Sequence, residues 1–307
     1  MNRTGLLFIL LCAFGCTLYA QQAPVYSQYM FNPFLINPAY AGSEQRFGAS
    51  MHYRDQWSGW EGAPRTISAL AHGRIYRERL ALGIVLEEDA FGITRQRDAL
   101  LGIAVHLPVR GSLLSLGFRG GMRFRSRDFQ KLNITDPGDP LLAGQFSEER
   151  YGRLGFGVQL QRERFAIGLS VPDVFDAEAP VSEPVADRIW AFPRRALVMT
   201  CAGSIRLSDG FSLRPSTLVW FEPESQSWAD VNLSLVVRDL FRIGCSYRST
   251  QTLVAVTEWR ATRTLRIAYS YDFSLSGGIP GAGASHEVLL GVDLPVRNES
   301  SRSPRHF

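Results

Sequence analysis

Apolar residues recur at every second position from residue 45 almost to the end of the chain. Between residues 230 and 238, for example, Val231, Leu233 and Leu235 alternate with Asn232 and Ser234. Because successive side chains of a β-strand point to opposite faces, this period predicts strands with one apolar face. After residue 20, no stretch approaches the roughly 18–20 consecutive apolar residues that a membrane-spanning helix needs. The pattern therefore predicts an all-β protein.

Fourteen segments carry the alternation. They are 47–54, 67–75, 80–87, 98–106, 114–125, 153–160, 164–170, 197–206, 211–222, 230–238, 241–248, 253–260, 265–273 and 287–294. Along the chain, short links between these segments alternate with links that are mostly longer. The exception is the link 249–251, which is short where a long one is expected. An even number of strands with short turns at one end and long loops at the other is typical of outer-membrane barrels. We predict a transmembrane up-and-down antiparallel β-barrel of about 14 strands over residues 45–295, with both chain termini in the periplasm.

A soluble β-sandwich also alternates and is the competing interpretation. The polar face of these strands is dominated by arginine, and Lys131 is the only lysine in a chain with 33 basic and 29 acidic residues. A sandwich would place more lysine and acidic residues on its outer face. Aromatic residues near strand ends fit the interfacial girdles of a membrane barrel, with outer-membrane lipid as the neighbour. These residues are Tyr53, Phe124, Phe221, Tyr247, Trp259 and Phe273.

Residues 1–20 have the pattern of a signal peptide. Arg3 precedes an apolar stretch, and Leu18-Tyr19-Ala20 forms a plausible cleavage site. Removal of this segment leaves only Cys201 and Cys245, which are predicted to face lipid on strands that are not neighbours, so no disulfide is expected. At the other end, residues 296–307 form a polar tail.

The segment 21–44 is rich in aromatic residues and contains two Asn-Pro steps, which exclude a long helix. So much aromatic surface is expected to pack against the periplasmic mouth or in the lumen, as a plug or latch or as a docking site for a partner. The residues concerned are Tyr29, Phe31, Asn32, Pro33, Asn37, Pro38 and Tyr40. In the first long loop, a rigid exposed patch and a packed loop tip remain alternatives for Trp57, Trp60, Gly62 and Pro64.

Charged residues gather on the face that the barrel would turn inward. Either they line an anion-favouring pore, or arginine–carboxylate pairs and a partial plug fill the lumen; we favour the paired lumen slightly. The principal candidates are Arg54, Arg74, Arg119, Arg123, Arg206, Arg266, Glu258 and Asp272.

Residues that would carry enzymatic chemistry do not form recognisable patterns. His52, His72 and His106 face inward on different strands, with no carboxylate or cysteine at metal-ligand spacing. No basic, aromatic stripe suggests a nucleic-acid partner. We expect no catalytic residue, no metal site and no cofactor.

The stretches SQYMFNPFLINPAYAG and YRDQWSGWEGAPRT, with the later SYDFSLS and SHEVLLG, resemble the PorP/SprF family of type IX secretion proteins over residues 21–294. This resemblance implies a non-enzymatic outer-membrane barrel that assists the secretion or surface attachment of particular cargo proteins, which are adhesin-like or related to gliding. It also implies partners among the periplasmic and outer-membrane subunits of the secretion system. A passive, anion-favouring porin is the alternative function, and an outer-membrane enzyme is a third.

Overall fold

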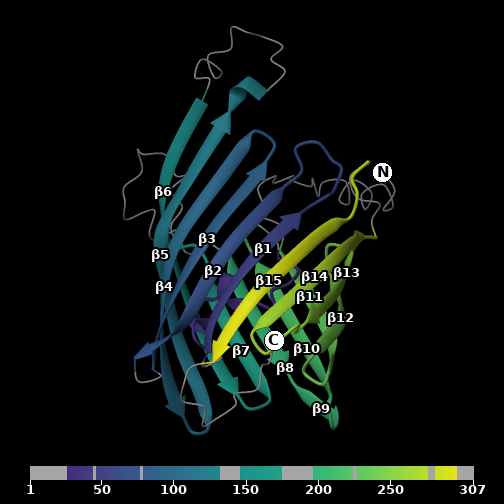
Figure 1. Cartoon of the computed structure of the whole chain (residues 1–307). Coiled ribbons are helices and arrows are strands. Elements are labelled where there is room, and N and C mark those ends of the chain that lie inside the picture. The colour runs from purple at the N-terminus through teal and green to yellow at the C-terminus, as the bar shows by residue number, and fades with distance from the viewer. Residues whose placement is uncertain are drawn as a thin grey trace, which may run out of the picture.

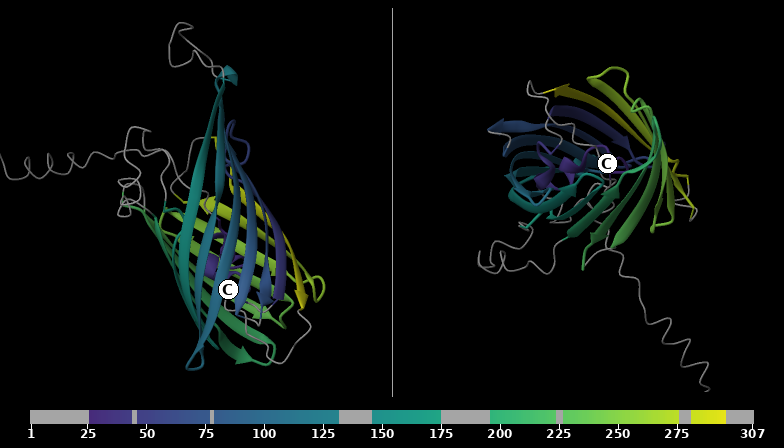
Figure 2. Two further views of the ribbon diagram at one scale, coloured as in Figure 1. Left: turned by 90° about the vertical axis from the view of Figure 1, so that its left-hand side faces the viewer. Right: turned by 90° about the horizontal axis from the view of Figure 1, so that it is seen from below.

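A computed structural model describes residues 26–43, 46–76, 79–131, 146–174, 196–223, 227–275 and 281–295 of the 307-residue chain. One antiparallel sheet dominates this part and closes on itself (Figures 1 and 2). Its strands are β1 (Arg46–Asp55), β2 (Arg65–Tyr76), β3 (Leu80–Phe91), β4 (Thr94–Val109), β5 (Ser112–Asp128), β6 (Phe146–Arg162), β7 (Phe165–Val171), β8 (Leu197–Gly203), β9 (Ile205–Ser208), β10 (Phe211–Phe221), β11 (Trp228–Val237), β12 (Phe241–Arg248), β13 (Thr252–Trp259), β14 (Leu265–Ser274) and β15 (Ser285–Pro295). Three short 3-10 helices accompany them: η1 (Pro33–Leu35), η2 (Pro38–Tyr40) and η3 (Phe129–Lys131). Among the described residues, no helix has the length and apolar character needed to span a membrane.

The first and last strands close the barrel. β1 pairs antiparallel with β15 from Arg46 opposite Pro295 to Asp55 opposite His286. Elsewhere each strand pairs with the next one, except that β8 and β9 both pair with β10, which also pairs with β11. Fourteen strands form the ring and β9 is an additional short strand, which confirms the predicted up-and-down barrel.

The additional strand arises from a break in the predicted strand 197–206. β8 pairs with β10 as far as Ala202 opposite Ser216, and β9 resumes the pairing at Ile205 opposite Leu213. Between these two pairs lies Pro215 of β10, which has no amide hydrogen to donate to the ladder. The prediction of one continuous strand was wrong here because the strand opposite cannot bond it along its whole length.

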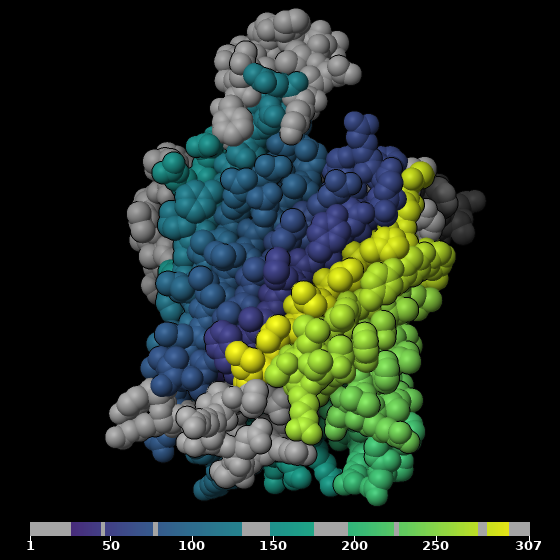
Figure 3. All heavy atoms as spheres, in the orientation of Figure 1, coloured from purple at the N-terminus to yellow at the C-terminus, as the bar shows by residue number. Residues whose placement is uncertain are grey.

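The two faces of the wall have the reverse of the polarity found in a soluble protein. Apolar side chains point outward, as at Leu101 and Ile243, which are 68% and 62% exposed. Polar side chains point inward, and Ser234 and Glu287 are fully buried. On the side shown in Figure 3, side chains of tilted neighbouring strands cover the surface in continuous bands. An apolar exterior around a polar interior is stable when the exterior faces hydrocarbon, so the sandwich alternative is excluded.

Strand lengths and links differ around the ring. β5 and β6 have 17 residues each, whereas β12 and β13 have eight, so the β5–β6 hairpin extends beyond the rest of the barrel (Figure 1). The predicted long link 88–95 is instead a tight turn, since Phe91 of β3 still pairs with Thr94 of β4. Long connections such as 56–64 and 275–284 lie at one end of the barrel. Tight turns such as 110–111 lie at the other end, where β1 begins and β15 ends. We call these the long-loop end and the short-turn end.

Two outward-facing cysteines remain in the described part of the chain. Cys201 lies on β8 and Cys245 on β12; both are free and exposed. The predicted signal peptide, residues 1–20, and the polar tail, residues 296–307, lie outside the described residues.

Candidate functional site in the barrel lumen

Residues 26–43, which we call the lumen segment, lie inside the barrel (Figure 2, right). Their side chains are almost completely buried, with Met30 at 0% and Phe34 at 1% exposure. Each Asn-Pro step begins a short 3-10 turn, because proline fixes φ at a value that such a turn requires. In the second turn, the Asn37 Oδ1 atom accepts a hydrogen bond from the amide of Ala39 at 2.9 Å. The segment is therefore compact rather than extended.

Glycines of the wall provide the room for this segment. A Cβ atom added at Gly83 of β3 would overlap the ring of Phe34. One added at Gly117 of β5 would overlap the main chain of Ala39. Any larger residue at these two positions is therefore incompatible with the observed packing.

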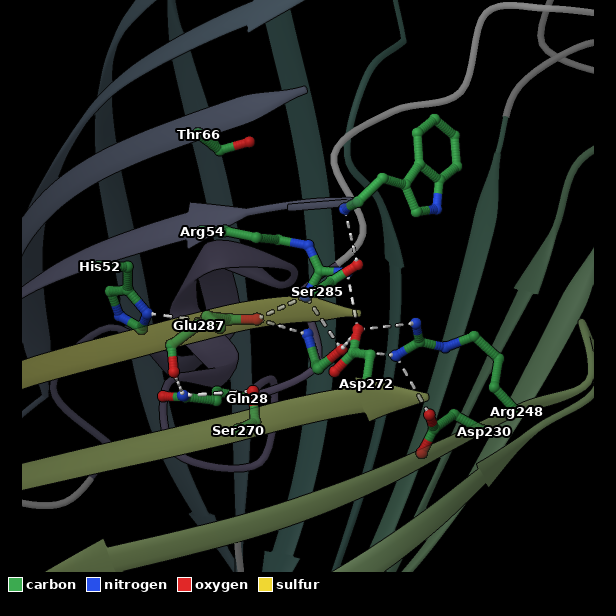
Figure 4. A network of polar contacts seen from close by, with 12 residues as sticks. Gln28, His52, Arg54, Thr66, Asp230, Arg248, Ser270, Asp272, Ser285 and Glu287 are labelled. Carbon is green, nitrogen blue, oxygen red and sulfur yellow. Dashed lines mark hydrogen bonds and ion pairs between the residues drawn. The ribbon is translucent and has the colours of Figure 1, made fainter. Parts of the chain in front are cut away.

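The first residues of the lumen segment bind a cluster of buried charges near the long-loop end (Figure 4). The Ser27 amide donates to Glu287 Oε2 at 2.9 Å, and its hydroxyl donates to Asp272 Oδ2 at 2.7 Å. The same hydroxyl accepts from Arg54 at 3.2 Å and from Arg248 at 3.1 Å. Arg54 also pairs with both carboxylates, at 2.7 Å and 3.1 Å. One serine thus completes a network of four charged side chains.

Neighbouring residues of the segment add further donors. Tyr26 donates its hydroxyl hydrogen to Glu87, and Tyr29 donates to Asp230 at 3.3 Å. The side-chain amide of Gln28 donates through Nε2 to the main-chain oxygen of Glu287 at 2.7 Å. Every one of these contacts places a donor of the lumen segment against an oxygen of the wall.

The later residues of the segment present main-chain carbonyls to the wall instead. Arg266 donates to the oxygen of Phe31 at 3.0 Å, and Arg119 donates to that of Leu35 at 2.7 Å. The Ser170 hydroxyl donates to the oxygen of Ile36 at 3.2 Å. Near the short-turn end, His106 Nε2 lies 2.9 Å from the oxygen of Ala41, and Arg74 donates to Gly42 at 2.7 Å. A carbonyl can only accept, so Nε2 of His106 carries the hydrogen.

The predicted plug or docking residues all lie within the lumen segment. Asn32 donates to the Ser50 hydroxyl at 2.5 Å, and Asn37 donates to the main-chain oxygen of Val158 at 3.1 Å. The ring of Phe31 lies 5.0 Å beneath the guanidinium of Arg242. Buried beside them are Tyr29, Pro38 and Tyr40, while Pro33 is half-buried.

Most of the predicted lumen charges lie on the inner face. Arg123 binds Asp98 through two nitrogens, each at 2.8 Å. Glu258 lies 3.4 Å from Arg266, which also pairs with Asp293 at 3.4 Å. Arg206 departs from this arrangement: its side chain is 76% exposed and pairs with Asp209 at 2.5 Å in the turn after β9. The break that separates β8 from β9 removes Arg206 from the regular inward row.

A second cluster of charges joins β4, β5 and β6. Arg153 pairs with both Asp98 and Asp173, the latter just beyond the end of β7. Partial burial would raise the pKa of Asp173, but the nearby Arg153 guanidinium outweighs it and holds that pKa below its usual value.

The predicted outer-loop residues belong to a loop that packs on its neighbours. The amide of Trp57 donates to the Ser285 hydroxyl at 3.2 Å, and the Gly62 oxygen accepts from Gly92 at 2.8 Å. Gln56 donates to the oxygen of Pro64 at 3.0 Å, which closes the loop. Trp60 lies at the surface, 41% exposed.

The lumen as a whole holds residues 26–43, and hydrogen-bond donors and acceptors of the wall contact them along their length. No group of three or more potential metal ligands occurs within the described ranges. Sequence reasoning missed Ser27, Gln28 and the wall glycines. Inward-facing glycines at Gly83, Gly117 and Gly157 were the available signal, since such positions otherwise carry polar side chains.

Comparison with known proteins gives a family and remote structural likenesses. The family described as "Type IX secretion system membrane protein PorP/SprF" matches residues 18–292. No curated protein matches the chain. The Acinetobacter baumannii outer membrane protein Omp33 is similar at 6% identity and a TM-score of 0.46, over 82% of this chain and 99% of that one. A triple mutant of Rhodopseudomonas blastica porin is similar at 8% identity and a TM-score of 0.40, over 81% and 99%. The fold described above does not depend on these two likenesses.

Proposed function

Because the chain belongs to the PorP/SprF family of type IX secretion membrane proteins, we propose that this outer-membrane barrel assists the secretion or surface attachment of specific cargo proteins. Its contribution is non-enzymatic and consists of binding. Adhesin-like or gliding-related proteins are the proposed cargo, and periplasmic and outer-membrane subunits of the secretion system are the proposed partners.

The observation that carries this proposal is the occupied lumen. A general porin needs an aqueous path, whereas Met30 and Phe34 are buried inside this barrel and wall side chains bind the main chain around them. Lumen charges such as Arg54, which pairs with Asp272 and Glu287, are not free to attract permeating anions. We therefore propose that the lumen segment acts as a plug and that the barrel works as a secretion component rather than as a passive pore.

The test compares the surface and medium proteomes of cells with and without the gene. Loss of one or a few cargo proteins, restored by the wild-type gene, is the expected result. Unchanged secretion together with altered uptake of small anions would reject the proposal in favour of the porin.

The plug itself is tested in planar bilayers. We expect little or no conductance for the purified wild-type barrel. A large, steady, anion-selective conductance with the lumen segment intact would contradict the plug.

A further inference from the structure

Exposed arginines gather on the outer face of one side of the barrel, next to the long-loop end. They are Arg65 of β2, Arg95 and Arg97 of β4, and Arg150 of β6, and we call them the arginine band. β2 to β6 are neighbours in the sheet and lie on one side of the barrel (Figure 1). The four cations therefore share one surface.

The arginine band directly follows the apolar outer surface of the same strands. On β4 the outward-facing row runs from Leu101, which is 68% exposed, through Ala99 to Arg97. On β2, Arg65 lies two positions from the exposed Ile67 and so faces the same way. Because the apolar surface faces hydrocarbon, the arginines lie at the level of the lipid head groups.

The opposite side of the ring has a different rim. β12, β13 and β14 lie across the barrel from β4 (Figure 2, right). Their outward-facing residues next to the long-loop end are Tyr247, Leu253 and Phe273, which are exposed and pair laterally with one another in the ladder. Arginines that served only to anchor the barrel in the interface would be expected around the whole ring, so the one-sided band points to a ligand.

Carboxylates neutralise only part of the band. Glu88 is shared by Arg97, at 2.6 Å, and Arg95, at 3.5 Å. Asp55 lies 3.1 Å from Arg65. Ion pairs at such exposed positions are weak, so these guanidinium groups remain able to bind a further anion.

Arg150 belongs to the band through β6. It is the outward-facing charged residue of this strand nearest to the apolar surface, and Glu148 lies one outward position farther from that surface. The Arg150 guanidinium lies 5.9 Å from the centre of the Phe124 ring on β5. The neighbouring strand thus places an aromatic ring, rather than a carboxylate, beside this cation.

The long loops of outer-membrane barrels face the outside, so the arginine band meets the outer leaflet. This leaflet is built from lipopolysaccharide, whose lipid A part carries phosphate groups where the hydrocarbon ends. Clusters of basic residues at this level bind anionic head groups, and the guanidinium fork matches the geometry of phosphate. We propose that the arginine band binds the phosphate groups of lipid A and holds lipopolysaccharide against β2 to β6.

Binding of purified lipid A to the full-length barrel in zwitterionic detergent tests the proposal, with native mass spectrometry giving the lipid concentration at half-saturation. The band variant carries Arg65→Gln, Arg95→Gln, Arg97→Gln and Arg150→Gln. The matched control carries the same change at four exposed arginines next to the short-turn end: Arg79→Gln, Arg110→Gln, Arg162→Gln and Arg164→Gln. Dephosphorylated lipid A is the second probe and is applied to the wild-type barrel.

We expect the band variant to need about tenfold or more lipid A for half-saturation, because it loses four charge-assisted contacts, and the control variant to match the wild type. Dephosphorylated lipid A is expected to bind the wild-type barrel as weakly as lipid A binds the band variant. Equal affinities of the two variants, or equal binding of both lipids by the wild type, would overturn the proposal. The lipid comparison uses only the wild-type protein, so it decides the question even if the band variant fails to fold. No secretion is measured, so failure here leaves the proposed secretion role untouched.

Discussion

Arg54 and Glu287 lie directly opposite each other on β1 and β15, and their side chains form a buried ion pair at 3.1 Å. The strands that close the barrel are thus joined by a ladder of main-chain hydrogen bonds and by this pair. Since Glu287 also accepts from the amide of Ser27, closure of the barrel and binding of the lumen segment depend on the same carboxylate.

Arg54→Gln removes one of the two cations of this network and leaves Glu287 without its arginine partner, while Arg248 still lies 3.9 Å from Asp272. We expect the free energy of unfolding to fall by about 3–5 kcal/mol, because breaking a buried ion pair leaves uncompensated charge. Urea unfolding in lipid vesicles measures the change. The matched control is Arg65→Gln, whose partner Asp55 lies 3.1 Å away at the surface and whose side chain is 66% exposed. Its expected effect is about 0–1 kcal/mol, and equal losses for the two variants would contradict the central role of the buried network.

Gly117→Leu places a side chain where the main chain of Ala39 lies. We expect the lumen segment to be displaced, with increased ion conductance in planar bilayers and faster proteolysis within residues 26–43. Gly152→Leu is the control, because a Cβ atom at Gly152 meets nothing within 4 Å. If conductance rises equally in both variants, displacement of the segment is not its cause.

Arg242→Met is expected to stabilise the barrel. The three guanidinium nitrogens of Arg242 are buried without a hydrogen-bond partner among the described residues; the Phe31 ring lies against the group, and Glu258 stands opposite Arg242 in the strand ladder. A methionine keeps most of the volume and removes the desolvated charge, so we expect a gain of about 1–3 kcal/mol in the free energy of unfolding. A loss of stability in the same urea experiment would show that the charge is compensated.

We expect Asp173 to make the stability of the protein depend on pH in the acidic range. Its pKa in the folded protein is lowered by Arg153, so its contribution to stability is present above the unfolded-state pKa near 3.9 and is lost as pH falls through the lower folded-state value. About a third of the side chain is exposed, so solvent screening limits the effect to about 1 kcal/mol or less. Asp173→Asn is expected to flatten the decline of the urea midpoint below pH 4. An unchanged pH profile in this variant would assign the decline to other carboxylates.

Trp60→Ala tests whether the outer loop contacts cargo. Exposed tryptophans at the centre of interfaces often contribute about 2 kcal/mol, which corresponds to roughly a 30-fold loss of affinity. We expect weaker retention of cargo on the cell surface, with an unchanged shift between unboiled and boiled samples on a denaturing gel. Normal cargo retention would assign Trp60 to packing of the loop, beside Gly281.

Much of the barrel could be predicted from the sequence, because the determining signal is local. Alternation at period two, as from Val231 to Val237, reports directly which side chains share a face of a strand. Links such as the tight turn 110–111 and the longer connection 56–64 distinguish the two ends of the barrel. These features determined the strand number of the ring, its antiparallel order and its two chemically different faces.

The contents of the lumen were decided only by the tertiary structure. Ser27, Arg54 and Glu287 are far apart in the sequence and meet only when β1 and β15 close the ring. The Asn-Pro steps of residues 26–43 predicted a turned, aromatic segment but not its direction through the barrel. That path is held by contacts with wall groups from strands throughout the chain, such as Glu287, Arg119 and His72. The break at Pro215 has the same origin, since a proline interrupts pairing only in the strand that lies opposite.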